Sequence, residues 1–399
     1  MMRSHWLVAV GAGRWQLPGI QAARLAGLKV IAVDGHSRAE GLSQADESLV
    51  VDIRNASAVI DAIVGTGISP DGAIAFCNEA GMTTAATVRE RFGLPCAGIE
   101  TTKALTNKGV QRARWAEAKL PGPKWRVVRS KAEVTAALGE IGGTVIFKPV
   151  DSAGSRGVSV IGPGDDWETA YSDSKMNSLA GEVIIEAFIV GVELTVETFT
   201  HRGETHVLAV TTKKKVPGTH GTVASELESA QLDADTRSRV DSVVIQALAA
   251  LAYTDGPGHT ELLLTGDREI FLVETAGRGG GFMVADGIVP FSCGFNLARA
   301  CALQAVGLDP ELPLAVPNRA VVLRFIPSRK GTVKSFRGFG ADDEIAGVIS
   351  EPIVTLGQEL GKASCDGDRM AFILAGANSI SEARRKADLR EQRIEFTIE

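Results

Sequence analysis

The chain has 399 residues, 45% of them hydrophobic, with a formal net charge of −6 at pH 7 and a pI of about 5.7. This length is enough for two or three domains and a sizeable core. The acidic balance, without a marked basic patch, argues against nucleic acid as a partner. No apolar run approaches the roughly 18 residues of a membrane span, and the apolar stretch near the N-terminus is too short for a signal peptide. The five cysteines form no CxxC pair, so we expect reduced thiols in a cytoplasmic protein.

Strands and helices alternate over the first part of the chain. We expect strands at residues 6–10, 29–34, 48–53 and 72–77, with helices between them such as 19–26 and 57–65. This alternation predicts a parallel sheet with helices on both faces. The unit ends near residue 103.

The turn GAGRWQ, residues 11–16, follows a strand and opens a helix, as a dinucleotide-binding fingerprint does, and Asp34 lies near the ribose-binding spacing. However, Gln16 stands where the third glycine belongs, and Pro18 delays the helix. A nicotinamide-dependent dehydrogenase is therefore a secondary hypothesis, and an ordinary tight turn is the main one.

A helix is expected from about 107 to 118, and the segment LPGPKW at 120–125 then starts a new unit. Ser130 and Glu133 form a capping box for the next helix. Further expectations are two strands joined by a loop within 145–161, a strand–hinge–strand at 181–200, a helix at 234–252, a hairpin at 258–274 turning at Gly266-Asp267, and a last helix and strand at 380–388 and 393–398.

The loop SAGSRG, residues 152–157, consists of small residues apart from Arg156, so its backbone N–H groups could approach phosphate oxygens closely. It is not a Walker A loop, since no GK[ST] follows. Lys148 precedes it at the end of a strand, which suits a cation held on phosphates beneath a flap. An ordinary glycine hairpin with a solvated lysine is the alternative.

The hairpin brings two carboxylates together. A two-residue turn at Gly266-Asp267 places Glu274 opposite His259, with Glu261 as its diagonal neighbour on the same face. Two such carboxylates could bind magnesium, which takes oxygen ligands and substrate phosphates. Arg278 follows in the turn AGRGGG and could neutralise a transferring phosphoryl group or a carboxylate. The alternative is that Glu261 faces solvent.

Other acidic side chains follow the hinge. Glu186 ends one strand, and Glu193, Thr195 and Glu197 share one face of the next strand, where a carboxylate could hold ribose hydroxyls. Each of these glutamates could instead face solvent.

Taken in order, the segments TNKGVQRARWAEA, FKPVDSAGSRGV, IIEAFIVGVELTVE and HTELLLTGDREIFLVETAGRGGG resemble the ATP-grasp superfamily, in its carboxylate–amine ligase branch that includes L-amino acid ligases. The resemblance covers nearly the whole chain. It implies the ATP-grasp fold, which combines α/β and α+β parts and has two lobes that clamp ATP. In this fold a Rossmann-like N-terminal α/β domain (1–103) precedes the ATP-grasp domain (104–310). A C-terminal α+β part (311–399) completes the grasp lobe. The lid lobe would span about 120–187 and the hinge 186–191.

The resemblance also implies roles for matching positions. Lys108 and Lys148 would contact the ATP phosphates, and Glu261 and Glu274 would bind magnesium. Arg278, with Lys148, would serve catalysis by steadying the acyl phosphate. The remaining nucleotide contacts would come from the lid (Ser152, Ala153, Gly154, Ser155, Gly157), the adenine-reading hinge (Glu186 and the backbone of Phe188 and Ile189), and Glu193 on the ribose.

One position departs from the pattern of many members. Their last motif reads Glu-x-Asn, with the asparagine as a further metal ligand, whereas this chain has Ala276 after Glu274 and Thr275. Alanine cannot bind a metal, so water or another oxygen must take its place. The amino acid ligases look similar at this position.

The implied reaction joins a carboxylate to an amine through an acyl phosphate, releasing ADP and phosphate. ATP and Mg²⁺ would be the cofactors, with two ions expected and Mn²⁺ as a substitute. Small-molecule carboxylates and amines, in particular amino acids, would be the substrates, and a homodimer is expected by analogy with the family. The segment at 211–230 is expected near the acceptor site. Lys213 to Lys215 are expected in a solvated charged loop, and the alternative is that they meet an acidic substrate.

Two alternatives remain. One is an acyl-phosphate enzyme of the formate-dependent glycinamide ribonucleotide transformylase or carboxylase type, and the other is a nucleotide-binding module without catalysis.

Overall fold

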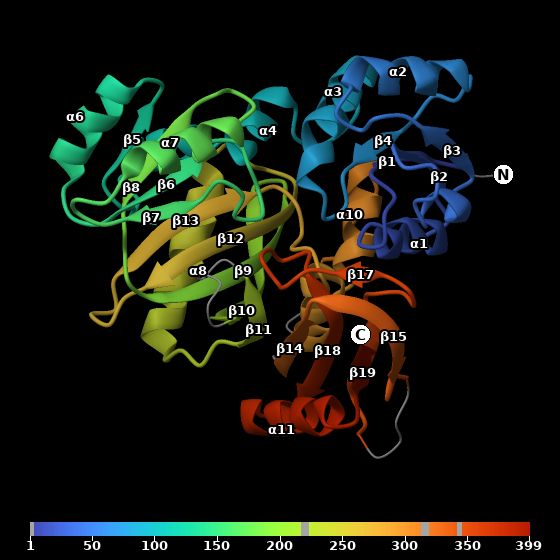
Figure 1. The fold of residues 1–399 in the computed structure, drawn as a ribbon. Helices are drawn as coiled ribbons and strands as arrows, with labels where there is room; N and C mark the ends of the chain where they lie inside the picture. The colour runs from blue at the N-terminus through green and yellow to red at the C-terminus, as the bar shows by residue number, and fades with distance from the viewer. Residues whose placement is uncertain (1–3, 217–222, 313–318, 341–344) are drawn as a thin grey trace.

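The computed structural model describes residues 4–216, 223–312, 319–340 and 345–399, and their strands form four sheets (Figure 1). A parallel sheet comes first in the chain, and three antiparallel sheets follow. The chain therefore combines an α/β unit with α+β units, as the sequence predicts.

The N-terminal sheet has the strand order β3-β2-β1-β4, with all pairs parallel. Its strands are β1 (Trp6–Val10), β2 (Lys29–Asp34), β3 (Glu47–Val50) and β4 (Gly72–Ile74), and its helices are α1 (Leu17–Leu25), α2 (Ala56–Gly65) and α3 (Met82–Phe92), with short 3-10 turns η1 (Leu42–Gln44) and η2 (Glu79–Gly81). The two central strands, β1 and β2, are mostly buried, apolar runs, as in a sheet covered on both faces, whereas the edge strand β3 is partly exposed. The third and fourth strands end three residues earlier than predicted.

A small antiparallel sheet, which we call the lid sheet, has the order β5-β8-β6-β7. It comprises β5 (Trp125–Val128), β6 (Val145–Pro149), β7 (Ser159–Ile161) and β8 (Val183–Ala187), together with α6 (Lys131–Ile141) and α7 (Trp167–Met176). The predicted cap is present, because the Ser130 hydroxyl accepts from the Glu133 amide. The Glu133 carboxylate returns to the amide of Arg129, one residue earlier than in a standard capping box.

The central sheet is antiparallel, in the order β13-β12-β9-β10-β11-β14-β18-β16. Its strands are β9 (Val192–His201), β10 (Glu204–Lys215), β11 (Ala224–Ser229), β12 (Gly256–Leu264), β13 (Ile270–Ala276), β14 (Ala320–Pro327), β16 (Val348–Pro352) and β18 (Arg369–Ala377). Helix α8 (Ala234–Ala250) packs apolar side chains against it, in one cluster with residues of α5 (Lys108–Glu117), which follows α4 (Ile99–Thr106). Strands from the C-terminal segment thus continue the sheet that begins in the middle of the chain.

The remaining elements connect and cover these sheets. They are the π-helical turn η3 (Val284–Ile288), α9 (Val289–Cys293), α10 (Leu297–Ala305), α11 (Ile380–Glu391), and a sheet in the order β17-β15-β19, formed by β15 (Gly331–Arg337), β17 (Glu359–Leu360) and β19 (Glu395–Ile398). Helix α10 lies against the N-terminal sheet (Figure 1). The approach is so close that a Cβ on Gly72 would lie 2.2 Å from the Ala305 carbonyl oxygen. The N-terminal unit is therefore packed firmly on the rest of the chain.

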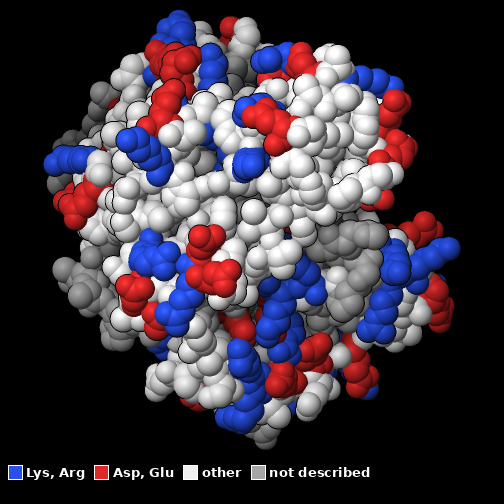
Figure 2. Space-filling view, turned by 90° about the vertical axis from the view of Figure 1, so that its left-hand side faces the viewer, with Lys and Arg blue, Asp and Glu red and all other residues white. Residues whose placement is uncertain are grey.

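Among the described helices none is both long enough and apolar enough to cross a membrane. The cysteines Cys77, Cys96, Cys293, Cys301 and Cys365 are all free thiols. On the face shown in Figure 2, Lys and Arg are interspersed with Asp and Glu and form no continuous basic surface.

Candidate functional site

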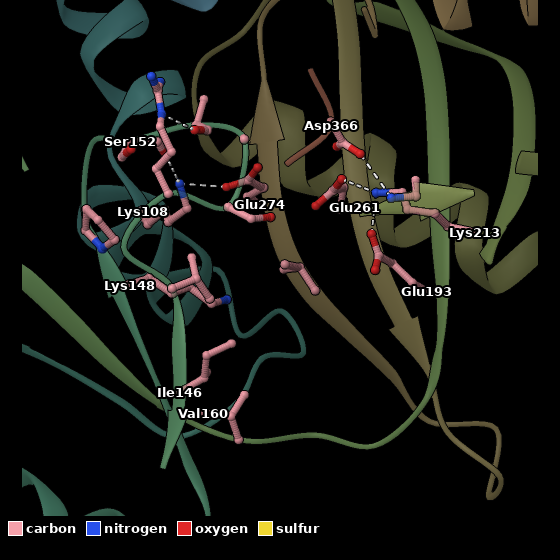
Figure 3. A pocket seen from close by; sticks show the side chains of 18 of the residues that line it. Lys108, Ile146, Lys148, Ser152, Val160, Glu193, Lys213, Glu261, Glu274 and Asp366 are labelled. Carbon is pink, nitrogen blue, oxygen red and sulfur yellow. Dashed lines mark hydrogen bonds and ion pairs between the residues drawn. The ribbon is translucent and has the colours of Figure 1, made fainter. Parts of the chain in front are cut away.

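A cavity of about 1790 Å³ lies between the lid sheet and the central sheet. Its wall includes the lid loop, the hinge and the β12–β13 hairpin, as well as a loop after β4 and residues near the start of β18. Figure 3 shows the charged residues that face one another across it. Every site residue predicted from the sequence lines this cavity except Gly157, which lies in the lid loop between lining residues.

Glu261 of β12 and Glu274 of β13 are direct partners across the hairpin, with no diagonal offset. The predicted register is therefore wrong, while the predicted meeting of the two carboxylates is confirmed. The Glu274 carboxylate lies 2.7 Å from the Lys108 ammonium, and the Glu261 carboxylate lies 2.6 Å from the Lys213 ammonium. The carboxylates therefore face the cavity, and the alternative with Glu261 in solvent is excluded.

Two local features cause the change of register. The turn contains three residues where two were predicted, because Thr265 pairs with Glu269 and Arg268 adopts a left-handed conformation with φ of 63°. A bulge between Glu261 and Leu262 then shifts the pairing by one more residue.

Lys148 and Glu186 form a buried group with Arg112, a residue of α5 that the sequence analysis missed. The Glu186 carboxylate accepts from Lys148 Nζ at 2.8 Å and from Arg112 Nε at 2.6 Å. Burial alone would raise the pKa of Glu186, but the charges of Arg112 and Lys148 lower it to about 2. Glu186 thus holds the two cations in this structure, with one hydrogen bond accepted by each carboxylate oxygen.

The hinge backbone offers another way to bind a base. The Phe188 amide donates to the Thr144 carbonyl, so it is already engaged. Within the described residues the Ile189 amide has no hydrogen-bond partner, and both residues line the cavity. Of the three hinge residues predicted to read adenine, Ile189 has the available donor.

The lid loop carries left-handed residues, with φ of 70° at Gly154, 59° at Ser155 and 69° at Gly157. Lys108 Nζ donates to the Ser152 carbonyl at 2.8 Å while also pairing with Glu274. One predicted phosphate ligand thus joins the lid loop to the hairpin. Burial alone would lower the pKa of Lys108, but Glu274 and Glu79 raise it above its usual value, so the side chain carries its charge.

Lys213 lies on β10, between the Glu193 and Glu261 carboxylates (Figure 3). Lys215 Nζ lies 2.8 Å from Glu193. The predicted solvated loop is therefore wrong for these two lysines, because the strand continues to Lys215 and alternate side chains point into the cavity. Residues 217–222 of that segment lie outside the described residues. Glu193, the predicted ribose ligand, is engaged by these two lysines.

Arg278 reaches across to the N-terminal unit, where its Nη2 lies 2.8 Å from the Glu79 carboxylate. Beside it, His259 pairs with Glu197, which also accepts from the Gly280 amide at 3.0 Å. Burial would lower the pKa of His259, but Glu197 raises it to about 9. Glu79 was missed because it comes from a loop that sequence patterns do not connect with the hairpin.

Asp34, the residue behind the dehydrogenase hypothesis, closes its own turn. One carboxylate oxygen accepts from the Ala12 amide at 2.8 Å and the other from the His36 amide at 2.8 Å. These two hydrogen bonds give Asp34 a structural role in the turn, which explains the residue without a bound ribose. Asp34 is also absent from the wall of the large cavity.

The described residues contain no group of three or more His, Cys, Asp or Glu side chains arranged to hold a metal ion. Glu261 and Glu274 nevertheless provide two converging carboxylates, which is the number that magnesium uses when substrate phosphates complete its coordination. Both carboxylates bind ammonium groups in this structure, so they already stabilise positive charge at this point. The donor set therefore fits a magnesium ion that arrives with a phosphate ligand.

Among known protein families, the sequence model of the ATP-grasp domain family matches residues 141–286 of this chain. The L-arginine-specific L-amino acid ligase of Bacillus subtilis is 26% identical over 326 residues, covering 78% of each chain. The formate-dependent phosphoribosylglycinamide formyltransferase of Pseudomonas entomophila (strain L48) is 26% identical over 395 residues, covering 94% of this chain and 93% of the other. The crystal structure of an L-amino acid ligase from Bacillus licheniformis superposes with a TM-score of 0.82 at 21% identity, covering 100% of this chain and 99% of the other.

Proposed function

We propose that the chain is an ATP-dependent carboxylate–amine ligase of the ATP-grasp superfamily, which forms an amide and releases ADP and phosphate. The observation that carries the proposal is the convergence of Glu261, Glu274, Lys108 and Lys148 with the lid loop on one cavity. Opposed carboxylates and flanking ammonium groups are what a phosphoryl transfer needs, because its catalysis consists mainly of positioning and charge stabilisation.

In the proposed reaction an oxygen of the substrate carboxylate attacks the γ-phosphorus of ATP, and the bond from that phosphorus to the β,γ-bridging oxygen breaks. The products are an acyl phosphate and ADP. The amine nitrogen then attacks the acyl carbon, phosphate leaves, and the nitrogen loses a proton. Lys108, Lys148 and Arg278 would hold the phosphate and carboxylate oxygens during these steps. The lid loop and hinge would exclude water from the acyl phosphate.

Glu261 and Glu274 would hold Mg²⁺ together with the phosphates. The ion would supply charge neutralisation for the triphosphate. Lys108 and Lys213 occupy oxygens of Glu274 and Glu261 in this structure, and they would have to leave these oxygens for the carboxylates to hold a metal. We also propose the domain division at residues 103 and 310, with a lid lobe at about 120–187. Two metal ions, Mn²⁺ as a substitute and a homodimer remain parts of the proposal.

The second candidate is an acyl-phosphate enzyme that uses formate and a phosphorylated ribosyl amine. The observation that favours it is the length of the match to the formyltransferase, which covers 94% of this chain. The formyltransferase and the amino acid ligase differ in the amine that they must recognise. The residues that bind the amine would therefore distinguish the two candidate functions.

The test is to incubate the purified protein with Mg²⁺ and ATP against single and paired amino acids, and separately against formate with phosphoribosylglycinamide. Phosphorus NMR follows the nucleotide, and mass spectrometry detects new amides. ADP, phosphate and an amide from two amino acids would support the ligase. A formylated ribonucleotide would support the second candidate, and AMP with pyrophosphate would refute phosphoryl transfer to the carboxylate.

A further inference from the structure

Both lysines that we propose as phosphate ligands are held by carboxylates in this structure. Lys108 Nζ lies 2.7 Å from the Glu274 carboxylate, and Lys148 Nζ lies 2.8 Å from the Glu186 carboxylate. An ammonium group that turns towards a phosphate leaves its carboxylate short of a counter-ion. At Glu274 a magnesium ion would take over that role. Glu186 is not one of the proposed metal ligands, so a second cation of the protein has to neutralise it.

Arg112 of α5 is this second cation, and it is firmly fixed. Its Nε donates to the Glu186 carboxylate of β8 at 2.6 Å, and its Nη2 donates to the Val273 carbonyl of β13 at 2.9 Å. Its third nitrogen, Nη1, has no partner among the described residues, so these two hydrogen bonds determine where the guanidinium lies. Its Cζ is 5.4 Å from the centroid of the Trp115 ring, and Trp115 Nε1 donates to the Ala247 carbonyl at 3.1 Å.

Lys148 is held more weakly. It lies on β6 beside the lid loop and lines the cavity (Figure 3). Within the described part of the chain, Glu186 is the one hydrogen-bond partner of its ammonium group. A lysine ammonium is a compact charge on a flexible stem, whereas a guanidinium is a planar fork that keeps its hydrogen bonds in a fixed geometry. Of the two cations at Glu186, Lys148 is therefore the one that can turn towards a ligand.

The group of Arg112, Glu186 and Lys148 has two positive charges and one negative charge, and its members are 3%, 2% and 8% exposed. Burial raises the pKa of Glu186, but the charge of Arg112 and, after it, that of Lys148 lower this pKa to about 2. The carboxylate is thus ionised, and the group has a surplus positive charge that an approaching anion would stabilise. When Lys148 turns to such an anion, Glu186 is still paired with Arg112. Without Arg112 it would become an unpaired buried carboxylate.

We propose that Arg112 is a positioning residue that keeps Glu186 neutralised, so that Lys148 can leave Glu186 and bind the phosphates of ATP. The inference rests on the proposed function, in which Lys148 contacts these phosphates, and it gives a role to a residue that acts through two others. Breaking a buried ion pair by removing one partner changes an equilibrium constant about a hundredfold or more. The loss of Arg112 should therefore weaken ATP binding.

The main experiment is a double-mutant cycle, with the Kd for ATP measured by calorimetry in the presence of Mg²⁺. Arg112→Met should raise this Kd about tenfold or more, because Lys148 is then the remaining counter-ion of Glu186 and stays with it. In the Glu186→Gln background no carboxylate retains Lys148, so Arg112→Met should change the Kd less than about threefold. An equal change in both backgrounds would overturn the proposal, since it would show that Arg112 contributes only packing.

Further variants serve as controls. Arg112→Lys keeps a cation near Glu186 and should retain part of the affinity. Arg114 is on the same helix, donates to the Leu251 carbonyl at 3.1 Å and does not line the cavity, so Arg114→Met should leave the Kd unchanged. A Kd raised equally by Arg114→Met would contradict the role of Glu186. Thermal unfolding shows which variants are folded, and Arg112→Gln replaces Arg112→Met in the cycle if the latter does not fold.

ATP binding is measured without a carboxylate or an amine, so the result does not depend on the ligase reaction. The predicted pattern of Kd values without an amide from any substrate would support the role of Arg112 and refute the proposed ligase. Amide formation with equal losses of affinity in both backgrounds would support the ligase and refute the role of Arg112. A folded wild type that binds no ATP would overturn both proposals.

Discussion

Arg278, in the glycine-rich turn after β13, and Glu79, in the turn after β4, form an ion pair of 2.8 Å across 199 residues of sequence. Burial opposes ionisation of Glu79, but Arg278 and Lys108 lower its pKa, so the carboxylate stays charged. The pair connects the N-terminal sheet with the hairpin that carries the proposed metal ligands. Glu79 therefore positions the guanidinium that we expect to bind the reacting carboxylate.

Glu79→Gln should test this positioning. The amide keeps the shape of the side chain but removes the charge, and losing a charged hydrogen bond costs about 1.5–3 kcal/mol. We expect kcat to fall about ten- to hundredfold, with the Kd for ATP unchanged, measured by ADP release and by nucleotide titration. Unchanged kcat would show that Arg278 is oriented without Glu79.

Glu274→Gln should abolish turnover while leaving nucleotide binding measurable. The substitution removes one of two carboxylates proposed to bind Mg²⁺, and it also frees Lys108, whose ammonium lies 2.7 Å from Glu274. Single-turnover measurements with ATP and a proven substrate pair would follow the loss, and fluorescence or calorimetric titration would follow binding.

Glu204→Gln is a suitable control for that experiment, because Glu204 is an exposed glutamate of β10 outside the cavity. It should behave as the wild type. Near-normal activity of Glu274→Gln would remove the assignment of Glu274 to the metal.

The sequence predicted the parts of the site that are carried by local patterns. The sequence predicted that Glu261 and Glu274 meet, because side chains alternate between the two faces of a strand and this alternation puts both carboxylates on the same face of the hairpin. Its register was predicted wrongly, since the left-handed Arg268 and the bulge at Glu261 depend on local backbone geometry that composition does not specify.

The partners of the predicted residues could not be found in this way. Arg112 meets Glu186 across 74 residues, and Glu79 meets Arg278 across 199 residues. Such pairs depend on how the units pack, and an arginine in an amphipathic helix gives no local signal of a buried partner.

Glu186 should make stability depend on pH. Its pKa is about 2 in the folded protein and 4.5 for the ordinary group, so its ionisation contributes about 3 kcal/mol above pH 4.5, as an upper limit. This contribution is lost as the pH falls from 4.5 towards 2. Glu186→Gln leaves Lys148 and Arg112 without their counter-ion and should be less stable at pH 7 by several kcal/mol.

The difference between wild type and Glu186→Gln should narrow as the pH falls below 4.5, and urea unfolding at pH 3–7 would measure it. The stability difference narrows because the pKa of Glu186 is lower in the folded state than in the unfolded state. In this pH range, unfolding of the wild type is accompanied by proton uptake at residue 186, and unfolding of the variant is not. A constant difference over this pH range would mean that Glu186 does not carry the charge.

Two glycines of the lid loop provide a matched pair for the lid hypothesis. At Gly157 a Cβ would lie 2.9 Å from Asn177 Cβ and 3.0 Å from Pro149 Cγ, whereas at Gly154 nothing lies within 4 Å. Both have nearly the same positive φ, 69° and 70°, so the backbone strain of an alanine is alike and only the steric contact differs.

Gly157→Ala should therefore raise KM for ATP several-fold more than Gly154→Ala, because only the first forces the base of the lid loop away from β6 and α7. Initial rates of ADP release at varied ATP would give the comparison, and thermal unfolding would show that both variants are folded. Equal KM values would mean that the position of the loop base does not affect nucleotide binding. A larger effect at Gly154 would instead indicate that the phosphates approach the tip of the loop at that residue, where an added methyl group would meet the ligand and not the protein.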